Sequence, residues 1–334
     1  MKRKFHLWMM IMGIILLASA LAALCAGQFH VPAGDVISIL AGKGSSIRNA
    51  ETTIRMVRIP RIVLTILAGA GLSAAGAAFQ SLFANPLATP DTLGTANGAS
   101  FGAAFGILLG LPAFGVQFLA LGMGVLAVLL VLFLTRAVPG IRSTSLIMVI
   151  LAGMVISSMF SALVSLVKYV ADPNDVLPVI TFWLMGSFSG TTMKSLTIGI
   201  PLIVAGLLIL FLMRYRMDAL SLSEDEARSL GINLPLTRGL IIFAASAITA
   251  SVVALCGVIG WVGLLIPHIV RMIFGNSNAR VVPGSMLTGA IFMLLTDTVA
   301  RCASAAEIPV SILTAVIGAP VFILLLRKTG GIQA

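Results

Sequence analysis

One stretch decides the fold: Arg58-Ile59-Pro60-Arg61, then the apolar run 62–83, then Asn85-Pro86-Leu87-Ala88-Thr89-Pro90. A helix needs about 20 apolar residues to cross the hydrocarbon core of a bilayer, and this run is long enough. Basic residues of membrane proteins usually collect on the cytoplasmic side. The orientation argued below puts Arg58 and Arg61 on the other side, so this pair indicates a partner.

The composition extends the membrane assignment to the whole chain. Of 334 residues, 59% are hydrophobic and 10% are charged, and the mean hydropathy is +1.12. Soluble domains carry about 25% charged residues, so this chain cannot cover a water-facing surface. Without a long polar insertion, residues 1–334 are expected to form one transmembrane domain. The net charge of +10 comes from single lysines and arginines in short loops, which favours membrane topology over nucleic-acid binding.

The apolar runs predict an all-α polytopic membrane protein with about ten transmembrane helices. They lie near 7–26, 62–83, 94–111, 114–134, 145–167, 193–213, 237–258, 261–274, 283–302 and 308–326. Segments 31–42 and 179–187 are expected to form short surface helices. Gly257, Gly260 and Gly263 interrupt the chain between the seventh and eighth spans. Irregular backbone at membrane depth is tolerated where protein buries it or where it lines a cavity.

The basic residues predict that both termini are cytoplasmic. With ten spans and the N-terminus inside, thirteen basic residues face the cytoplasm: Lys2, Arg3, Lys4, Arg136, Arg142, Arg214, Arg216, Arg228, Arg238, Arg271, Arg280, Arg327 and Lys328. Eight face outwards: Lys43, Arg48, Arg55, Arg58, Arg61, Lys168, Lys194 and Arg301. The outer minority is concentrated at 55–61, immediately before the second span.

The loop 214–238 is the most polar part of the chain, and it is expected on the cytoplasmic side. Residues 221–231 predict a short helix, because Ser223 can cap its first turn and Gly231 can end it. This helix is either a solvated connector or a docking element for a cytoplasmic subunit.

The sequence supports no catalytic chemistry. It has no phosphate-binding loop of the G-x-x-x-x-G-K-[ST] type, so the chain is not expected to hydrolyse ATP. The segment 186–190 has Phe188 where a nucleophile elbow needs serine. The histidines and cysteines lack metal-ligand spacing, so neither catalytic nor metal-binding residues are expected.

Asp297 lies inside the ninth span, where ionisable groups usually form pairs or line a polar path. Arg301 is four residues further on, so a local ion pair is the simplest expectation. Proton coupling would require more acids within the spans.

The chain resembles the permease subunits of ATP-driven importers for ferric siderophores, haem and vitamin B12, the FecCD type. The resemblance covers nearly the whole chain and rests on these motifs: Arg58-Ile59-Pro60-Arg61, Gly69-Ala70-Gly71-Leu72-Ser73-Ala74-Ala75-Gly76, Gln80, Asn85-Pro86-Leu87-Ala88, Leu93-Gly94, Asn97-Gly98-Ala99, Ala227-Arg228-Ser229-Leu230-Gly231, Gly263-Leu264-Leu265-Ile266-Pro267-His268-Ile269-Val270-Arg271 and Gly318-Ala319-Pro320-Val321-Phe322.

The resemblance implies a vitamin B12-importer-permease-like fold and a multi-subunit complex. Its expected partners are a second permease (a copy or a paralogue), two cytoplasmic ATPases, an extracytoplasmic binding protein and membrane lipid, with no nucleic acid. The chain itself would bind no cofactor, because ATP and Mg are used by the ATPases. Two arginines of the R-x-P-R motif and one ending the ninth helix dock the binding protein in this family. They correspond to Arg58, Arg61 and Arg301.

The resemblance also implies a coupling element and a cytoplasmic gate. The coupling residues, which would transmit ATPase motion, are Ser223, Glu224, Ala227, Arg228, Leu230 and Gly231. The possible gate comprises Ser145, Leu146 and Ile147. Met148 stands where many relatives have a basic residue, so the gate departs from the family pattern.

The function expected from the sequence is therefore the permease subunit of an importer that carries an iron–siderophore complex across a bacterial or archaeal plasma membrane. Haem, cobalamin and molybdate are alternative substrates. An ion-coupled secondary transporter is the alternative class, and it predicts several acids within the spans. An intramembrane enzyme would need a nucleophile or metal cluster, which the sequence does not show.

Overall fold

The computed structural model describes residues 2–45, 47–137, 146–222, 224–304 and 306–328, and these residues form helices without a β-strand. The α-helices, in chain order, are α1 (Lys2–Cys25), α2 (Ala33–Leu40), α3 (Ala50–Thr52), α4 (Ile59–Leu82), α5 (Thr95–Leu108), α6 (Ala113–Ala137), α7 (Leu146–Val170), α8 (Val176–Leu184), α9 (Met193–Met217), α10 (Glu224–Ser229), α11 (Leu234–Cys256), α12 (Val262–Phe274), α13 (Asn278–Ala303) and α14 (Val310–Lys328). The other helical segments are η1 (Thr53–Arg58, a π-helix), η2 (Pro90–Leu93) and η3 (Asp218–Ser221), both 3₁₀.

Each of the ten predicted spans coincides with a helix, which confirms the all-α membrane fold. Among the described residues, seven helices are long and apolar enough to cross a membrane: Lys4–Cys25, Ala50–Leu82, Ala113–Arg136, Leu146–Val170, Gly199–Leu220, Leu234–Cys256 and Asn278–Ala303. Helices α5 and α12 are shorter than these seven, and so is the apolar part of α14, Val310–Leu325. The expected short helices at 31–42 and 179–187 are present as α2 and α8.

Helix α4 is the centre of the bundle and packs against α9, α11, α12 and α13. Its close contacts depend on glycine: a Cβ on Gly69 would lie 2.2 Å from the Gly289 carbonyl oxygen of α13. A Cβ on Gly76 would lie 1.8 Å from the Gly263 carbonyl oxygen of α12. Small residues let helix backbones approach in this way inside a membrane. The approach to α13 brings together Arg61 at the start of α4 and Arg301 in the last turn of α13, two of the predicted docking arginines.

The glycine-broken connection between α11 and α12 is non-helical, as predicted. Its backbone is tied to the segment after α8, because the Ser187 amide donates to the Cys256 carbonyl at 2.8 Å. Gly257 adopts a φ of 74°, and a Cβ there would lie 2.3 Å from the Trp183 carbonyl oxygen. Protein groups thus form hydrogen bonds with this irregular backbone, which is the condition for non-helical backbone inside a membrane.

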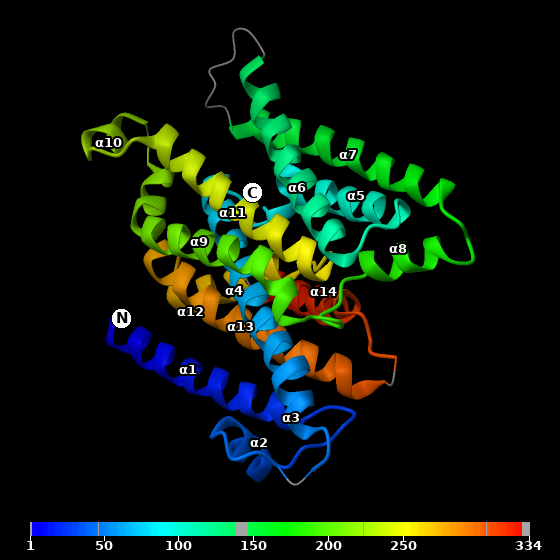
Figure 1. Cartoon of the computed structure of the whole chain (residues 1–334). Coiled ribbons are helices and arrows are strands. Elements are labelled where there is room, and N and C mark those ends of the chain that lie inside the picture. Colours follow the sequence, from blue (N-terminus) through cyan, green and yellow to red (C-terminus); the bar gives the residue numbers. More distant parts are fainter. Residues whose placement is uncertain (1, 46, 138–145, 223, 305, 329–334) are drawn as a thin grey trace.

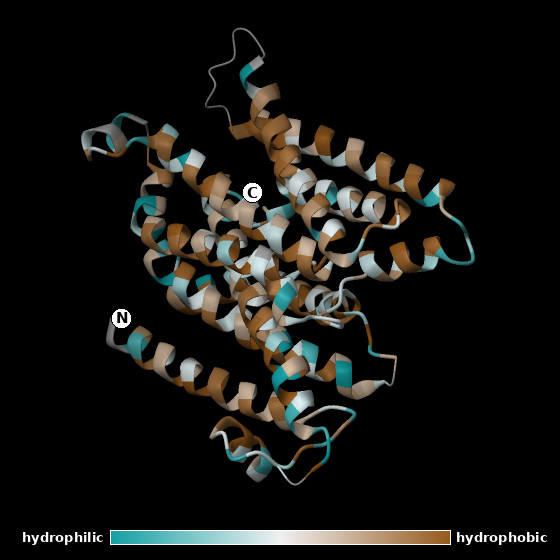
Figure 2. Ribbon diagram, in the orientation of Figure 1, coloured by the Kyte–Doolittle hydropathy of each residue, from teal (hydrophilic) through white to brown (hydrophobic). Residues whose placement is uncertain are grey.

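The two ends of the bundle are distinct (Figure 1). Helix α10 lies at one end, and α2 and α3 lie near the opposite end, beside the C-terminal end of α1. Apolar residues dominate the long helices, and the hydrophilic residues gather at α10, at the loops and near α3 (Figure 2). Large apolar side chains on outward faces, such as Phe118 and Phe133 of α6, are strongly exposed. This surface fits lipid or a second transmembrane subunit.

Candidate functional site: an arginine cluster and a polar loop at opposite ends of the bundle

The two arginines of the opening motif lie where a π-helix passes into an α-helix. Arg58 ends η1, and Ile59 begins α4 with Pro60 in its first turn. Proline is tolerated there because first-turn amides have no partner within the helix. Residues three apart are neighbours on a helix surface, so Arg58 at the end of η1 and Arg61 in the first turn of α4 project from neighbouring positions. Single-turn π-segments are frequent at functional sites.

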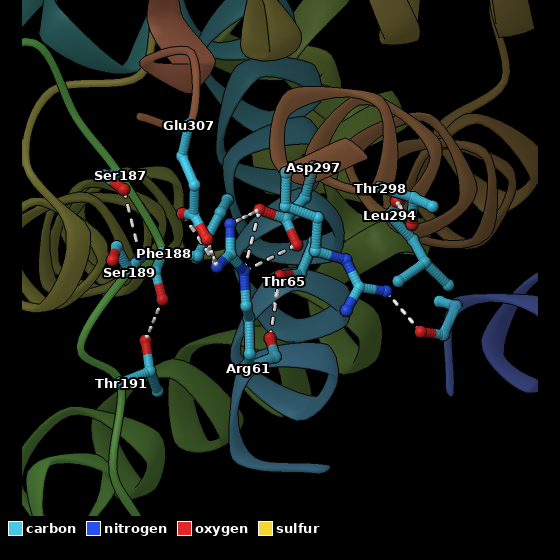
Figure 3. Close-up of polar contacts among 12 residues, drawn as sticks. Arg61, Thr65, Ser187, Phe188, Ser189, Thr191, Leu294, Asp297, Thr298 and Glu307 are labelled. Carbon is cyan, nitrogen blue, oxygen red and sulfur yellow. Dashed lines mark hydrogen bonds and ion pairs between the residues drawn. The ribbon is translucent and has the colours of Figure 1, made fainter. Parts of the chain in front are cut away.

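Arg61 is held between two acids (Figure 3). Its Nε donates to both carboxylate oxygens of Asp297, at 3.1 and 3.0 Å, and its Nη2 donates to Asp297 Oδ1 at 2.8 Å. Its Nη1 donates to both carboxylate oxygens of Glu307, at 3.0 and 2.9 Å. The guanidinium thus joins α4 to α13 and to the connector between α13 and α14. Charge-assisted pairs of this geometry are the strong class of hydrogen bond.

The expected local pair between Asp297 and Arg301 is not formed: within the described ranges, the ion-pair partner of Asp297 is Arg61. Asp297 is fully buried at the contact between α13 and α4, so its carboxylate faces the neighbouring helix. The i, i+4 spacing places Arg301 on the same side of α13, but its guanidinium turns towards α1. Sequence spacing identified the residues and missed the pairing.

Arg58 and Arg301 both bind the C-terminal end of α1. Arg58 donates through Nη1 to the Leu24 carbonyl and through Nη2 to the Phe29 carbonyl. Arg301 donates through Nη2 to the Ala23 carbonyl. The last four carbonyls of a helix lack intrahelical partners and carry its negative dipole end. Two guanidinium groups from elsewhere in the chain therefore cap α1.

Gly27 makes room for this cap. It adopts a φ of +138°, and a Cβ there would lie 2.9 Å from Arg58 Nη2 and 3.8 Å from Arg301 Nη1. Both guanidinium groups therefore approach the same glycine. L-residues rarely adopt such a φ. Glycine is therefore needed here both for the backbone conformation and for the space that the two guanidinium groups occupy.

The structure thus brings together the three arginines expected to dock a binding protein, but it buries them. Arg58, Arg61 and Arg301 are 3%, 5% and 5% exposed. The exposed basic side chains at this end come from the preceding segment: Lys43, Arg48 and Arg55. Arg55 pairs with Glu51 at 2.9 Å. Glu307 and the α1 carbonyls were not anticipated, although Glu307 lies six residues after Arg301.

The predicted coupling helix is α10, at the opposite end. Ala227 is fully buried, and the Ile232 amide donates to its carbonyl at 3.0 Å. Gly231 follows with a φ of 72°, as expected for a helix-ending glycine. Leu230 is 64% exposed. Glu224 and Arg228 belong to α10, and Ser223 lies outside the described residues. An apolar side chain exposed beside an acidic turn suits a protein contact.

A cavity of about 690 Å³ lies beside the segment that leads into this loop. Arg271 on its wall donates to the Ala77 carbonyl at 3.1 Å and to Ser81 Oγ at 3.3 Å. Asp218, the first residue of η3, accepts from the Asn278 amide at 2.6 Å and from Ser277 Oγ at 2.9 Å. The segment that leads into the predicted coupling helix is therefore bonded directly to the N-terminus of α13.

Two of the three possible gate residues begin α7. Leu146 is half-buried, and Ile147 is 71% exposed, whereas Ser145 lies outside the described residues. Among the described residues, histidine, cysteine, aspartate and glutamate form no group that could hold a metal ion.

Comparisons with known proteins define the class. Residues 15–328 match the FecCD transport family. The chain is 40% identical to the molybdate import system permease protein MolB of Haemophilus influenzae, over 94% of each chain. It is 38% identical to a probable iron chelatin transport system permease protein of Helicobacter pylori, over 83% of this chain and 82% of the relative. It is 35% identical to the vitamin B12 import system permease protein BtuC of Salmonella typhi, over 96% and 95%.

Two solved structures are similar to this chain. A metal-chelate type ABC transporter in an inward-facing conformation matches with a TM-score of 0.86 at 37% identity, over 96% of this chain and 98% of that one. PsaBC from Streptococcus pneumoniae matches with a TM-score of 0.56 at 17% identity, over 87% and 95%, which shows the fold alone.

The chain is a multi-pass membrane permease, the translocation subunit of an ABC importer. It belongs to the FecCD transport family. Its relatives differ in the substrate for which they are named, so membership alone leaves the substrate open.

Proposed function

We propose that this permease translocates a ferric siderophore delivered by an extracytoplasmic binding protein, driven by two cytoplasmic ATPases. The observation that carries the proposal is the separation of two sites at opposite ends of one bundle. Arg58 and Arg301 bind the C-terminal end of α1. That end lies near α2 and α3, and α10 lies at the opposite end of the bundle (Figure 1). An importer that receives cargo on one side and ATPase motion on the other needs this arrangement.

The outer site would dock the binding protein through charge. Arg58, Arg61 and Arg301 exceed Asp297 and Glu307 by one positive charge, and the exposed side chains Lys43 and Arg48 add to it. Complementary charge raises association rates and fixes orientation, and salt weakens it. An acidic surface on the binding protein is the partner that this end fits.

The inner site would receive an ATPase. Ala227 anchors α10 while Leu230 remains exposed for contact, and Gly231 sets the exit of the loop. Movement of this loop would reach α13 through the bonds from Asp218 to Ser277 and Asn278. Ser223, Glu224 and Arg228 belong to the same proposed contact, and Ser145, Leu146 and Ile147 to the proposed gate. A second permease, either a copy or a paralogue, would cover part of the exposed apolar surface.

The substrate proposal rests on two similarities. One relative is named for iron chelatin, and the structure with the TM-score of 0.86 is a metal-chelate type transporter. Molybdate is the second candidate, because the relative at 40% identity is named for it. A secondary transporter is disfavoured, since Asp297 is already paired with Arg61.

Ligand identification separates the substrates. The cognate binding protein is purified without added ligand and examined by native mass spectrometry and elemental analysis. We expect iron with an organic chelator. Molybdenum without a chelator would establish molybdate instead, and a cobalt-containing corrinoid or a haem would exclude both.

A further inference from the structure

The two acids that hold Arg61 differ in how freely they can leave. Asp297 lies within α13, and its side chain is 1% exposed. Glu307 lies on the connector before α14, and its side chain is 29% exposed. Asp297 engages Nε and Nη2, whereas Glu307 engages only Nη1. Removing the buried acid would strand a charge inside the protein, but Glu307 can exchange its contact for water or for another acid.

The backbone at Glu307 also favours exchange. Its φ is +52°, in the left-handed region that non-glycine residues seldom adopt. Such conformations persist where surrounding contacts hold them, and they concentrate at sites that switch or clamp. Here the Glu307 amide donates to the Ser304 carbonyl at 3.1 Å, and the next amide, of Ile308, donates to the Ala300 carbonyl at 3.2 Å. The ion pair with Arg61 is a further contact that holds this residue.

The charge around Arg61 favours an acid as the group that replaces Glu307 when it leaves. Arg58 and Arg301 approach Gly27 from two elements and bind only carbonyl oxygens within the described part of the chain. With Glu307 in place, three guanidinium groups face two carboxylates. Without it they face one, and like charges in a buried site repel. A carboxylate from outside would restore the balance.

We propose that Glu307 occupies the place on Arg61 that a carboxylate of the binding protein takes on docking. This proposal rests on the docking function proposed above for the outer arginine cluster. Docking then exchanges an internal acid for an external one and frees the connector around Glu307. The connector leads directly into α14, whose first amide, of Val310, donates to the Gly186 carbonyl at 3.0 Å. Binding outside is thereby linked to the position of a transmembrane helix.

Removal of the internal competitor should tighten docking. The test measures binding of the purified cognate binding protein to the permease–ATPase complex in nanodiscs, at low and high salt. For Glu307→Gln we expect the Kd to fall roughly threefold to tenfold at low salt, a range set by the modest strength of a partly exposed pair. Glu307→Gly, which also suits a φ of +52°, should behave alike. Glu307→Asp keeps the charge and should bind less tightly than either.

Matched controls separate this exchange from general electrostatics. Glu51→Gln removes an exposed acid at the same end without touching Arg61, so its Kd should change less than about twofold. In the background Arg61→Gln with Asp297→Asn, which removes the buried charges together, Glu307→Gln should bring no gain. Size-exclusion profiles and unfolding curves verify each fold. Unchanged or weaker binding by both Glu307→Gln and Glu307→Gly would overturn the proposal.

The same data test the docking function separately. If the double Arg61/Asp297 variant binds the partner as tightly as the native protein, then Arg61 has no role in docking. The docking function proposed for the arginine cluster would then be wrong for this residue. If that variant binds weakly while the Glu307 variants show no gain, docking holds and the exchange alone is wrong.

Discussion

Arg61 on α4 and Asp297 on α13, 236 residues apart, form a buried pair in which the guanidinium donates to both carboxylate oxygens. The glycine contact between Gly69 and Gly289 brings the same two helices together deeper in the bundle. The pair therefore fixes the outer end of the contact around which the bundle is built. It also orients the arginine that the docking proposal requires.

Breaking this pair should destabilise the permease. Asp297→Asn leaves Arg61 buried with only Glu307, and losing one partner of a buried pair costs about 3 kcal/mol. Thermal unfolding of the detergent-solubilised protein measures the change. Glu307→Gln is the control and should cost less than about 1 kcal/mol, because its side chain is partly exposed. Equal stability of Asp297→Asn and the native protein would show that the pair contributes nothing net.

The α1 cap predicts an unusual sensitivity at Gly27. Gly27→Ala places a Cβ 2.9 Å from Arg58 Nη2 at a φ of +138°, which should cost roughly 1–3 kcal/mol in strain. The connector after α1 should become more susceptible to protease. Gly34→Ala in α2 is the matched control, since no atom lies within 4 Å of its Cβ position. Similar proteolysis of the two variants would refute the cap.

The outer arginines should make docking dependent on salt. In the double variant Arg58→Gln with Arg301→Gln, we expect roughly tenfold weaker binding of the binding protein at low salt, and convergence with the native protein at high salt. Surface plasmon resonance on the permease in nanodiscs gives both values. Arg214→Gln is the control: it changes a basic residue in the last turn of α9, near the α10 end of the bundle. This variant should bind the binding protein normally. A salt response identical to that of the native protein would contradict charge-based docking.

The coupling assignment predicts loss of communication without loss of insertion. Ala227→Pro removes a backbone donor inside α10 and costs about 3 kcal/mol at an interior helical position. Leu230→Asp leaves the backbone intact and alters only an exposed apolar contact. Both variants should insert and bind the outer partner, yet release the ATPase or hydrolyse ATP without transport. Native transport rates in both would make this loop an ordinary connector.

The sequence predicted the helices well because apolar run length governs membrane insertion. The second span was predicted to begin at residue 62, but the helical stretch begins earlier, because α3, η1 and α4 are continuous from Ala50 to Leu82. Gly102 and Gly106 of α5 pack closely against α6. Gly110 instead ends α5 with a φ of +67°.

Side-chain partners were harder to predict. The i, i+4 rule applies only within one helix, so it predicted the pair Asp297–Arg301. In the structure α4 packs against α13, and Asp297 pairs with Arg61 of α4 instead. The burial of Arg58 and Arg301 was not predictable either, because both bind the end of α1, which is far away in the sequence. Glu307 did carry a signal, because it is an isolated acid two residues before Pro309 and six residues after Arg301.

The most direct test of the account is uptake into proteoliposomes that contain the permease and its ATPase, with the cognate binding protein outside and ATP enclosed. Radiolabelled ferric siderophore should accumulate only when ATP, the ATPase and the binding protein are all present, and a proton or sodium gradient should not replace ATP. Uptake by the permease alone, driven by an ion gradient, would contradict the assignment as an ATP-driven importer subunit.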